Sequence, residues 1–239
     1  MSEPIRLDKL LVHMGYGTRK EIKKTLKKGL VTVDGELITN SAIKVNPTTQ
    51  SIKFAGSKIN YREFIYVMLN KPAGYISATE DDREKTVVEL LSAKERAFKP
   101  FPVGRLDKDT EGLLLLTNDG KLAHNLTSPR KKVAKRYYAL IKGEVNEEDQ
   151  KAFRQGVVLD DGYQTLPAQL EIIKSAAKSE VEVVIYEGKY HQVKRMFLAR
   201  GKKVLYLRRL AMGSLELDEQ LAPGQYRELT DEELALLKT

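Results

Sequence analysis

Charged side chains crowd a short loop that leads into a run of leucines. Between Gly104 and Gly112 the chain holds two bases and three acids: Arg105, Asp107, Lys108, Asp109 and Glu111. Leu113 to Leu116 follow and predict a buried strand that ends at the turn residues 118–120. A carboxylate on a loop that a rigid strand holds is suited to nucleophilic or acid–base chemistry. A solvated surface turn has the same composition, so these residues alone leave both interpretations open.

The charge of the chain is high and unevenly spread. Among 239 residues there are 41 Lys and Arg against 33 Asp and Glu, a net charge of +8. Residues 1–60 carry a net +6, whereas residues 214–239 carry a net −5. The remaining middle part is therefore basic as well. Two basic regions indicate a polyanionic partner, most simply nucleic acid.

Several classes of protein are excluded by composition. The chain has no cysteine and only three widely separated histidines, so we expect no disulfide and no metal site. There is no phosphate-binding loop or dinucleotide fingerprint, so we expect no cofactor. We also find no apolar run of membrane-spanning length and no apolar core of a signal peptide, which predicts a cytoplasmic protein without a membrane partner.

The N-terminal residues form a self-contained pattern. Leucines at helical spacing predict a helix over 7–14, and a capping box from Thr18 to Glu21 begins a second helix over 19–28. Alternating residues around Asp34 and Gly35 predict a hairpin. We expect a linker near residues 56–58. The second helix would hold phosphates through its basic residues, Arg19, Lys20, Lys23, Lys24, Lys27 and Lys28.

The rest of the chain mixes strands with helices. The pattern predicts a helix over 147–155, with Asn146 as its N-cap and Gly156 after it, and a helix over 191–200. Apolar alternation predicts further strands over 64–69, 134–141, 181–186 and 204–207. The fold class is therefore α+β.

Four segments resemble one enzyme family. Residues 104–114 match the G-R-L-D-x-x-T-x-G-L-L signature of rRNA pseudouridine synthases, and those of the small-subunit (RsuA-like) kind are the most similar. The loop 70–74, the Lys-Arg-Tyr at 135–137 and the segment 187–197 resemble further family motifs. Residues 1–58 resemble the S4 RNA-binding domain. The resemblance implies an S4-like helix–helix–hairpin module at 1–58 and a catalytic synthase domain at 62–239 with a mainly antiparallel sheet.

The resemblance also implies roles for individual residues. Asp107 would be the essential carboxylate, Tyr137 would stack on the target base, and Lys194 would pair with Asp107 and keep it charged. Many family members have arginine at the position of Lys194. Further RNA contacts would come from Arg105, Lys71, Lys189, His191 and Gln192. The implied reaction is the isomerisation of a uridine in rRNA to pseudouridine, without a cofactor.

Other functions stay open at this point. The segment Tyr190 to Lys194 is most similar to enzymes that act on small-subunit (16S) rRNA, but a large-subunit (23S) target is the alternative. A non-catalytic RNA-binding protein of ribosome assembly would also keep this fold. A carboxylate-based glycosidase or nucleosidase would use the same acid but has no use for residues 1–60. We expect a monomer whose partner is rRNA or an assembling ribosomal subunit.

Overall fold

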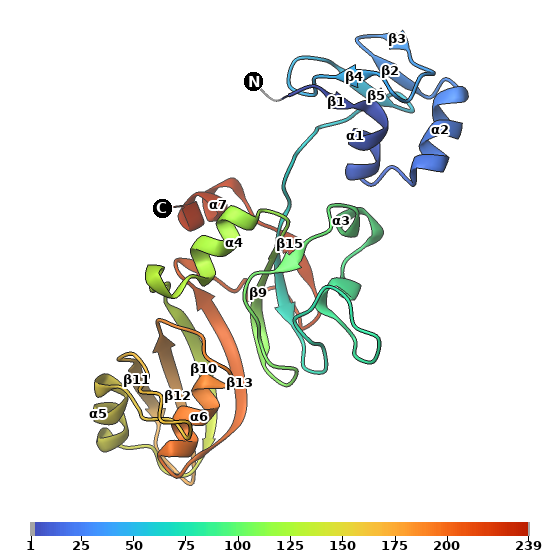
Figure 1. Cartoon of the computed structure of the whole chain (residues 1–239). Coiled ribbons are helices and arrows are strands. Elements are labelled where there is room, and N and C mark those ends of the chain that lie inside the picture. Colours follow the sequence, from blue (N-terminus) through green and yellow to red (C-terminus); the bar gives the residue numbers. More distant parts are fainter. Residues whose placement is uncertain (1–2, 239) are drawn as a thin grey trace. The chain divides into compact units, whose positions relative to one another are not determined.

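The computed structural model describes residues 3–238, which form two compact units (Figure 1). Unit 1 contains the chain up to Ile65 together with Leu91–Pro100. Unit 2 contains Tyr66–Leu90 and the chain from Phe101 onward. Within residues 3–238, no helix is both long enough and apolar enough to cross a membrane.

Unit 1 is built from short helices and strands. Thr18 caps α2 with the predicted capping box, because its hydroxyl accepts from the backbone of Glu21 while the Glu21 carboxylate accepts from the backbone of Thr18. The helices are α1 (Leu7–His13) and α2 (Arg19–Lys27). One sheet has the order β3-β2-β5-β6, with β2 (Val31–Val33), β3 (Glu36–Leu37), β5 (Ile52–Phe54) and β6 (Ser57–Lys58). A second pairs β1 (Ile5–Arg6) with β4 (Lys44–Val45).

The turns of unit 1 confirm one prediction and correct another. Asp34 and Gly35 both have positive φ, 52° and 90°, as a two-residue hairpin turn between β2 and β3 requires. Residues 56–58, which we expected to be a linker, instead turn the chain into β6, which pairs with β5. The turn itself is formed by Ala55 and Gly56, both with positive φ, 47° and 82°, and the expectation failed because Gly and Ser occur in tight turns as well as in linkers.

Unit 1 also contains a segment from later in the chain. Residues 91–100 include α3 (Ala93–Ala97), and the Phe98 ring packs edge-on against the His13 ring with centroids 4.7 Å apart. The guanidinium of Arg62 lies 5.1 Å from the centre of the same ring. Nothing in the local pattern indicated that this segment joins the N-terminal unit, because its contacts span about eighty positions of the chain.

Unit 2 is a mixed sheet with helices packed around it. The strand order is β11-β12-β10-β13-β9-β7-β15, with β14 beside β13 and β8 beside β9. Its strands are β7 (Tyr66–Lys71), β8 (Phe101–Pro102), β9 (Glu111–Thr117), β10 (Lys135–Lys142), β11 (Gln169–Lys174), β12 (Lys178–Ile185), β13 (Lys203–Met212), β14 (Leu215–Glu216) and β15 (Tyr226–Glu228). Its helices are η1 (Val87–Leu90), α4 (Gly120–Thr127), η2 (Pro129–Lys131), α5 (Glu147–Gln155), α6 (Gln192–Ala199) and α7 (Asp231–Lys238).

The predicted mainly antiparallel α+β fold is confirmed, and one pairing differs from the rest. Among the described strands of this sheet, β9 and β13 are the parallel pair, in register at Glu111 with Arg208 and at Gly112 with Arg209. Gly112 has φ +99°, and a Cβ there would overlap the Arg209 carbonyl oxygen and lie 2.8 Å from its nitrogen. A glycine is therefore required for the two strands to approach. This pairing brings the loop before β9 next to β13.

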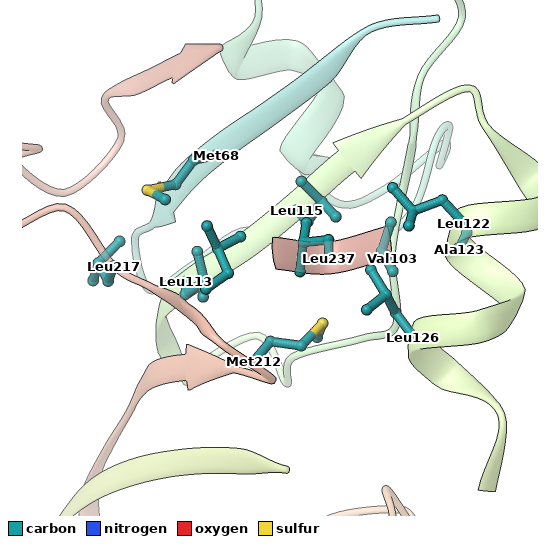
Figure 2. Packing of buried hydrophobic residues seen from close by; sticks show 11 residues of the cluster. Met68, Val103, Leu113, Leu115, Leu122, Ala123, Leu126, Met212, Leu217 and Leu237 are labelled. Atoms are coloured by element: carbon teal, nitrogen blue, oxygen red, sulfur yellow. The ribbon is translucent and has the colours of Figure 1, made fainter. Parts of the chain in front are cut away.

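The four leucines of β9 are buried on both faces of the sheet. Leu113 and Leu115 belong to an apolar cluster with Met68 of β7 (Figure 2). The other members come from β8–β9, α4 and the C-terminal region, among them Val103, Leu122, Ala123, Leu126, Met212, Leu217 and Leu237. Leu114 and Leu116 are buried as well. A strand that is covered on both faces reads as a continuous apolar run, as the sequence indicated.

Candidate active site

An open pocket lies in unit 2 where one loop, three strands and the start of a helix meet. The loop before β9, the strands β10, β12 and β13, and the start of α6 contribute its walls. The lining residues are Arg105, Leu106, Asp107, Thr110, Tyr137, Ile185, Gly188, Lys189, His191, Gln192, Val193 and Leu207.

Asp107 is part of an ion-pair cluster at this pocket. Its Oδ2 lies 2.8 Å from Lys194 Nζ, so the predicted contact between the two residues is present. Lys194 Nζ also lies 2.6 Å from Asp109 Oδ1, and His191 Nε2 lies 3.5 Å from Asp107 Oδ1. Partial burial opposes the charge of Lys194, but its bonds to Asp107 and Asp109 raise its pKa above the usual value. The lysine is thus held in its charged form beside the carboxylate.

The fold explains how residues so far apart in sequence meet. Glu111 begins β9 beside Arg208 of the parallel strand β13, so the loop before β9 and the chain that enters β13 approach the sheet from the same edge. Helix α6 immediately precedes β13 and places Lys194 in its first turn. Because both segments lead into adjacent parallel strands, their charged side chains converge.

A buried lysine fixes the loop that carries Asp107. Lys71, at the end of β7, is 0% exposed, and its ammonium donates to the carbonyls of Pro72, Lys108 and Thr110 at 3.0, 3.3 and 2.8 Å. Burial lowers the pKa of Lys71 to about 8, although the nearby acids Asp109 and Asp107 oppose this shift. The predicted RNA contact of Lys71 is therefore wrong, because the side chain points inward to satisfy backbone carbonyls.

Two neighbouring residues hold the same loop. The Ser77 hydroxyl donates to the Leu106 carbonyl at 2.9 Å and accepts from the Leu106 amide at 3.0 Å. The Gly74 amide donates to the Lys108 carbonyl at 2.8 Å. The segment 70–77 therefore positions the Asp107 loop, a role that the sequence analysis missed. The Asn-Lys-Pro-Ala-Gly motif at 70–74 marked this segment as a tight turn, but the sequence of a turn does not indicate which part of the chain it contacts.

A buried glutamate fixes the loop on the other side of the pocket. Glu187 accepts from the Tyr163 hydroxyl at 2.7 Å, the Leu166 amide at 2.9 Å and the Gln192 side-chain amide at 3.0 Å. Gln192 is itself buried, and its carbonyl oxygen accepts from the Lys189 amide at 2.9 Å. Gln192 also lines the pocket, so its predicted RNA contact stays a prediction. Its polar groups are used within the protein, and sequence reasoning missed Glu187 and Tyr163 as their partners.

The other predicted residues line the pocket or lie at the protein surface. Tyr137 on β10 is 7% exposed and forms part of the pocket wall. Arg105 and Lys189 are exposed at its rim, and His191 is half-buried between the rim and Asp107. In unit 1, the six basic residues that we call the α2 face are all exposed: Arg19, Lys20, Lys23, Lys24, Lys27 and Lys28.

This arrangement can perform a specific kind of chemistry. An acid with a fixed counter-charge faces a pocket that has an aromatic wall and a cationic rim. The carboxylate can attack or deprotonate a sugar carbon, the ring can pack against a base, and the rim can neutralise phosphates.

The chain is similar to known proteins over nearly its whole length. The sequence profile of the RNA pseudouridylate synthase family matches residues 65–199, and that of the S4 domain matches residues 5–50. An uncharacterized RNA pseudouridine synthase of Bacillus subtilis, YtzG, is 53% identical over 98% of both chains. The ribosomal small subunit pseudouridine synthase A of Vibrio cholerae is 42% identical over 97% of this chain and 98% of its own.

Solved structures agree with these sequence matches. A crystal structure of a pseudouridylate synthase has a TM-score of 0.68 and 36% identity, and the match covers 98% of this chain and 99% of the other. The residues that the family profile matches include the loop that the structure places at the pocket. The chain therefore belongs to the RNA pseudouridine synthase family and combines that enzyme's mixed-sheet domain with an N-terminal S4 domain.

Proposed function

We propose that this enzyme converts a specific uridine of small-subunit rRNA to pseudouridine, with Asp107 as the essential carboxylate. The observation that carries the proposal is the 2.8 Å pair of Asp107 with Lys194 at the pocket. Lys194 is held in its charged form and lies directly against this carboxylate. An ionised carboxylate is the group that the reaction requires at the sugar.

The reaction rearranges one nucleoside without a net change in its atoms. The C1′–N1 bond of uridine breaks, the uracil turns, and a C1′–C5 bond forms; C5 then loses its proton and N1 gains one. Asp107 acts either by attacking C1′, as the nucleophile of a retaining glycosidase does, or by removing the proton at C2′. Both routes need the ionised acid and no redox step.

The other residues of the site support the handling of RNA. The target base is shielded in stacked RNA, so it must be turned out into a pocket before it reacts. Tyr137 offers an aromatic wall to the base, and Arg105 and Lys189 offer positive charge to the adjoining phosphates. We propose residues 1–58 as the S4-type RNA-binding domain, with the α2 face as its phosphate contact, and residues 62–239 as the catalytic domain.

The small-subunit target is supported by two observations. The relative from Vibrio cholerae is named for the ribosomal small subunit, and its similarity extends over nearly the whole chain. The sequence of the segment Tyr190 to Lys194 is also most similar to that of enzymes that act on small-subunit rRNA. The substrate would be the rRNA or an assembling ribosomal subunit, and the protein would act as a monomer in the cytoplasm.

The proposal is tested by tritium release from rRNA labelled at C5 of uridine. The purified enzyme is mixed separately with labelled small-subunit and large-subunit rRNA, each free and in partly assembled particles. We expect release from the small-subunit substrate and one new pseudouridine when the product is sequenced. Release from large-subunit rRNA alone would overturn the target, and free uracil as product would overturn the reaction.

A further inference from the structure

We propose that Tyr190 and His191 form a second base-binding site that stacks on the nucleotide adjoining the target uridine. This inference rests on the proposed function, because it concerns how the same RNA is held. It adds a residue, Tyr190, that does not line the pocket. The ligand is an unpaired nucleobase of any identity, bound through its flat face.

The two rings form a stacked pair that is open on one side. Their centroids lie 3.8 Å apart, and their planes are inclined by 17°. Tyr190 is nevertheless 75% exposed, which is unusual for so large an aromatic side chain. Since His191 covers one face of the tyrosine ring, the opposite face is available to solvent. An exposed aromatic face is the surface on which single-stranded nucleic acids stack their bases.

The pair is held firmly by the residues on either side. His191 has φ 49°, a left-handed conformation that a residue other than glycine adopts only where its surroundings impose it. Glu187 fixes the preceding turn through its bonds to Tyr163, Leu166 and Gln192. The ammonium of Lys189 lies 4.3 Å from the centre of the Tyr163 ring and ties the loop to a second segment. A pre-formed surface loses little conformational entropy when a base binds.

The position of the pair decides which base it receives. His191 lines the pocket, and its Nε2 is 3.5 Å from Asp107 Oδ1. Tyr190 is stacked on that imidazole and does not itself line the pocket, so a base on Tyr190 lies next to the pocket and outside it. When the target uridine is turned out, its neighbour loses a stacking partner. The Tyr190 face replaces that partner, while Arg105 and Lys189 at the rim neutralise the connecting phosphates.

Binding of a short single-stranded RNA that carries the fluorescent base 2-aminopurine beside one uridine tests this site without turnover. Stacking quenches that fluorophore, so we expect quenching with the wild type and with Tyr190→Phe. Tyr190→Ala should abolish the quenching and weaken binding by about fivefold to a hundredfold, the range for losing one base–aromatic stack. Leu198→Ala is the matched control, because it truncates another exposed apolar side chain, 63% exposed, near the C-terminal end of α6, the helix that follows Tyr190.

Turnover of labelled rRNA separates this inference from the proposed function. Tyr190→Ala should raise KM by a similar factor while kcat changes little, and Tyr190→Phe should restore the wild-type KM. If the wild type releases tritium and Tyr190→Ala binds and turns over RNA as the wild type does, the stacking site is refuted and the function stands. If quenching depends on Tyr190 but no rRNA releases tritium, the stacking site stands and the proposed function fails.

Discussion

The buried lysine at position 71 allows a prediction that separates positioning from RNA binding. Lys71→Met keeps the length of the side chain but removes the ammonium that donates to two carbonyls of the Asp107 loop, those of Lys108 and Thr110, and to the Pro72 carbonyl. The loop would then be free to shift. A displacement of a catalytic group by about 1 Å can cost about a hundredfold in rate. We expect kcat to fall by about ten- to a hundredfold while the affinity for RNA stays unchanged, because Lys71 does not reach the RNA.

The same substitution has a pH signature. The pKa of Lys71 falls from the ordinary 10.5 to about 8 in the folded protein. Between these values the unfolded chain holds the proton and the folded chain has released it, so this group makes the folded state more stable as pH rises. At about 1.4 kcal/mol for each pKa unit, the gain is up to about 3 kcal/mol between pH 8 and 10.5. Lys71→Met lacks this gain.

Urea unfolding of both proteins from pH 7 to 10.5 measures the effect. The free energy of unfolding of the wild type minus that of Lys71→Met should increase with pH by up to about 3 kcal/mol. Lys121→Met, which removes an exposed lysine of α4, controls for the loss of one charge. A difference that stays constant over this range would refute the burial argument. If Lys71→Met instead binds RNA more weakly with an unchanged kcat, Lys71 contacts the RNA and does not position the Asp107 loop.

Three further predictions concern the ion pair, the S4 domain and the strand junction. Lys194→Met should lower kcat strongly, because Asp107 loses the cation that it contacts, whereas Lys194→Arg should retain most of the activity. A wild-type kcat in Lys194→Met would contradict the pairing. Replacing the six residues of the α2 face by glutamine should make the slope of log affinity against log salt shallower, by about 0.7 for each phosphate that the variant no longer binds. A slope equal to that of the wild type would show that this face does not bind RNA. Gly112→Ala should lower the melting temperature and the activity together, since the new methyl group overlaps the backbone of Arg209; a variant as stable as the wild type would show that β9 and β13 can separate without cost.

The parts of the fold that were predicted correctly depend on local signals. The capping box at Thr18, the Asp34–Gly35 hairpin and the Asn146 cap of α5 each involve residues within four positions of one another. The leucine run predicted β9 because continuous apolar residues favour a strand that is buried on both faces. The Asp107–Lys194 pair was also predicted, but that prediction rested on the resemblance to a known family and not on the periodicity of the sequence.

The parts that were missed depend on contacts far apart in sequence. Residues 118–120 were interpreted as a turn, but Asp119 accepts from the Leu122 amide at 3.0 Å and begins α4. The same residue types favour a turn and a helix cap, and the tertiary packing of the next residues decides between them. The burial of Lys71 and Gln192 was not predicted, because polar residues in a motif are usually exposed. Their burial depends on carbonyls and carboxylates that the fold brings together, which a single sequence does not indicate.

The central claim is that Asp107 performs the chemistry, and tritium release by Asp107→Asn on C5-labelled small-subunit rRNA tests it most directly. Asparagine keeps the shape of the side chain and removes the charge that faces Lys194. We expect the rate to fall by several powers of ten, with RNA affinity and melting temperature close to those of the wild type. Tritium release by Asp107→Asn at a rate near that of the wild type would contradict the assignment of this carboxylate to the reaction.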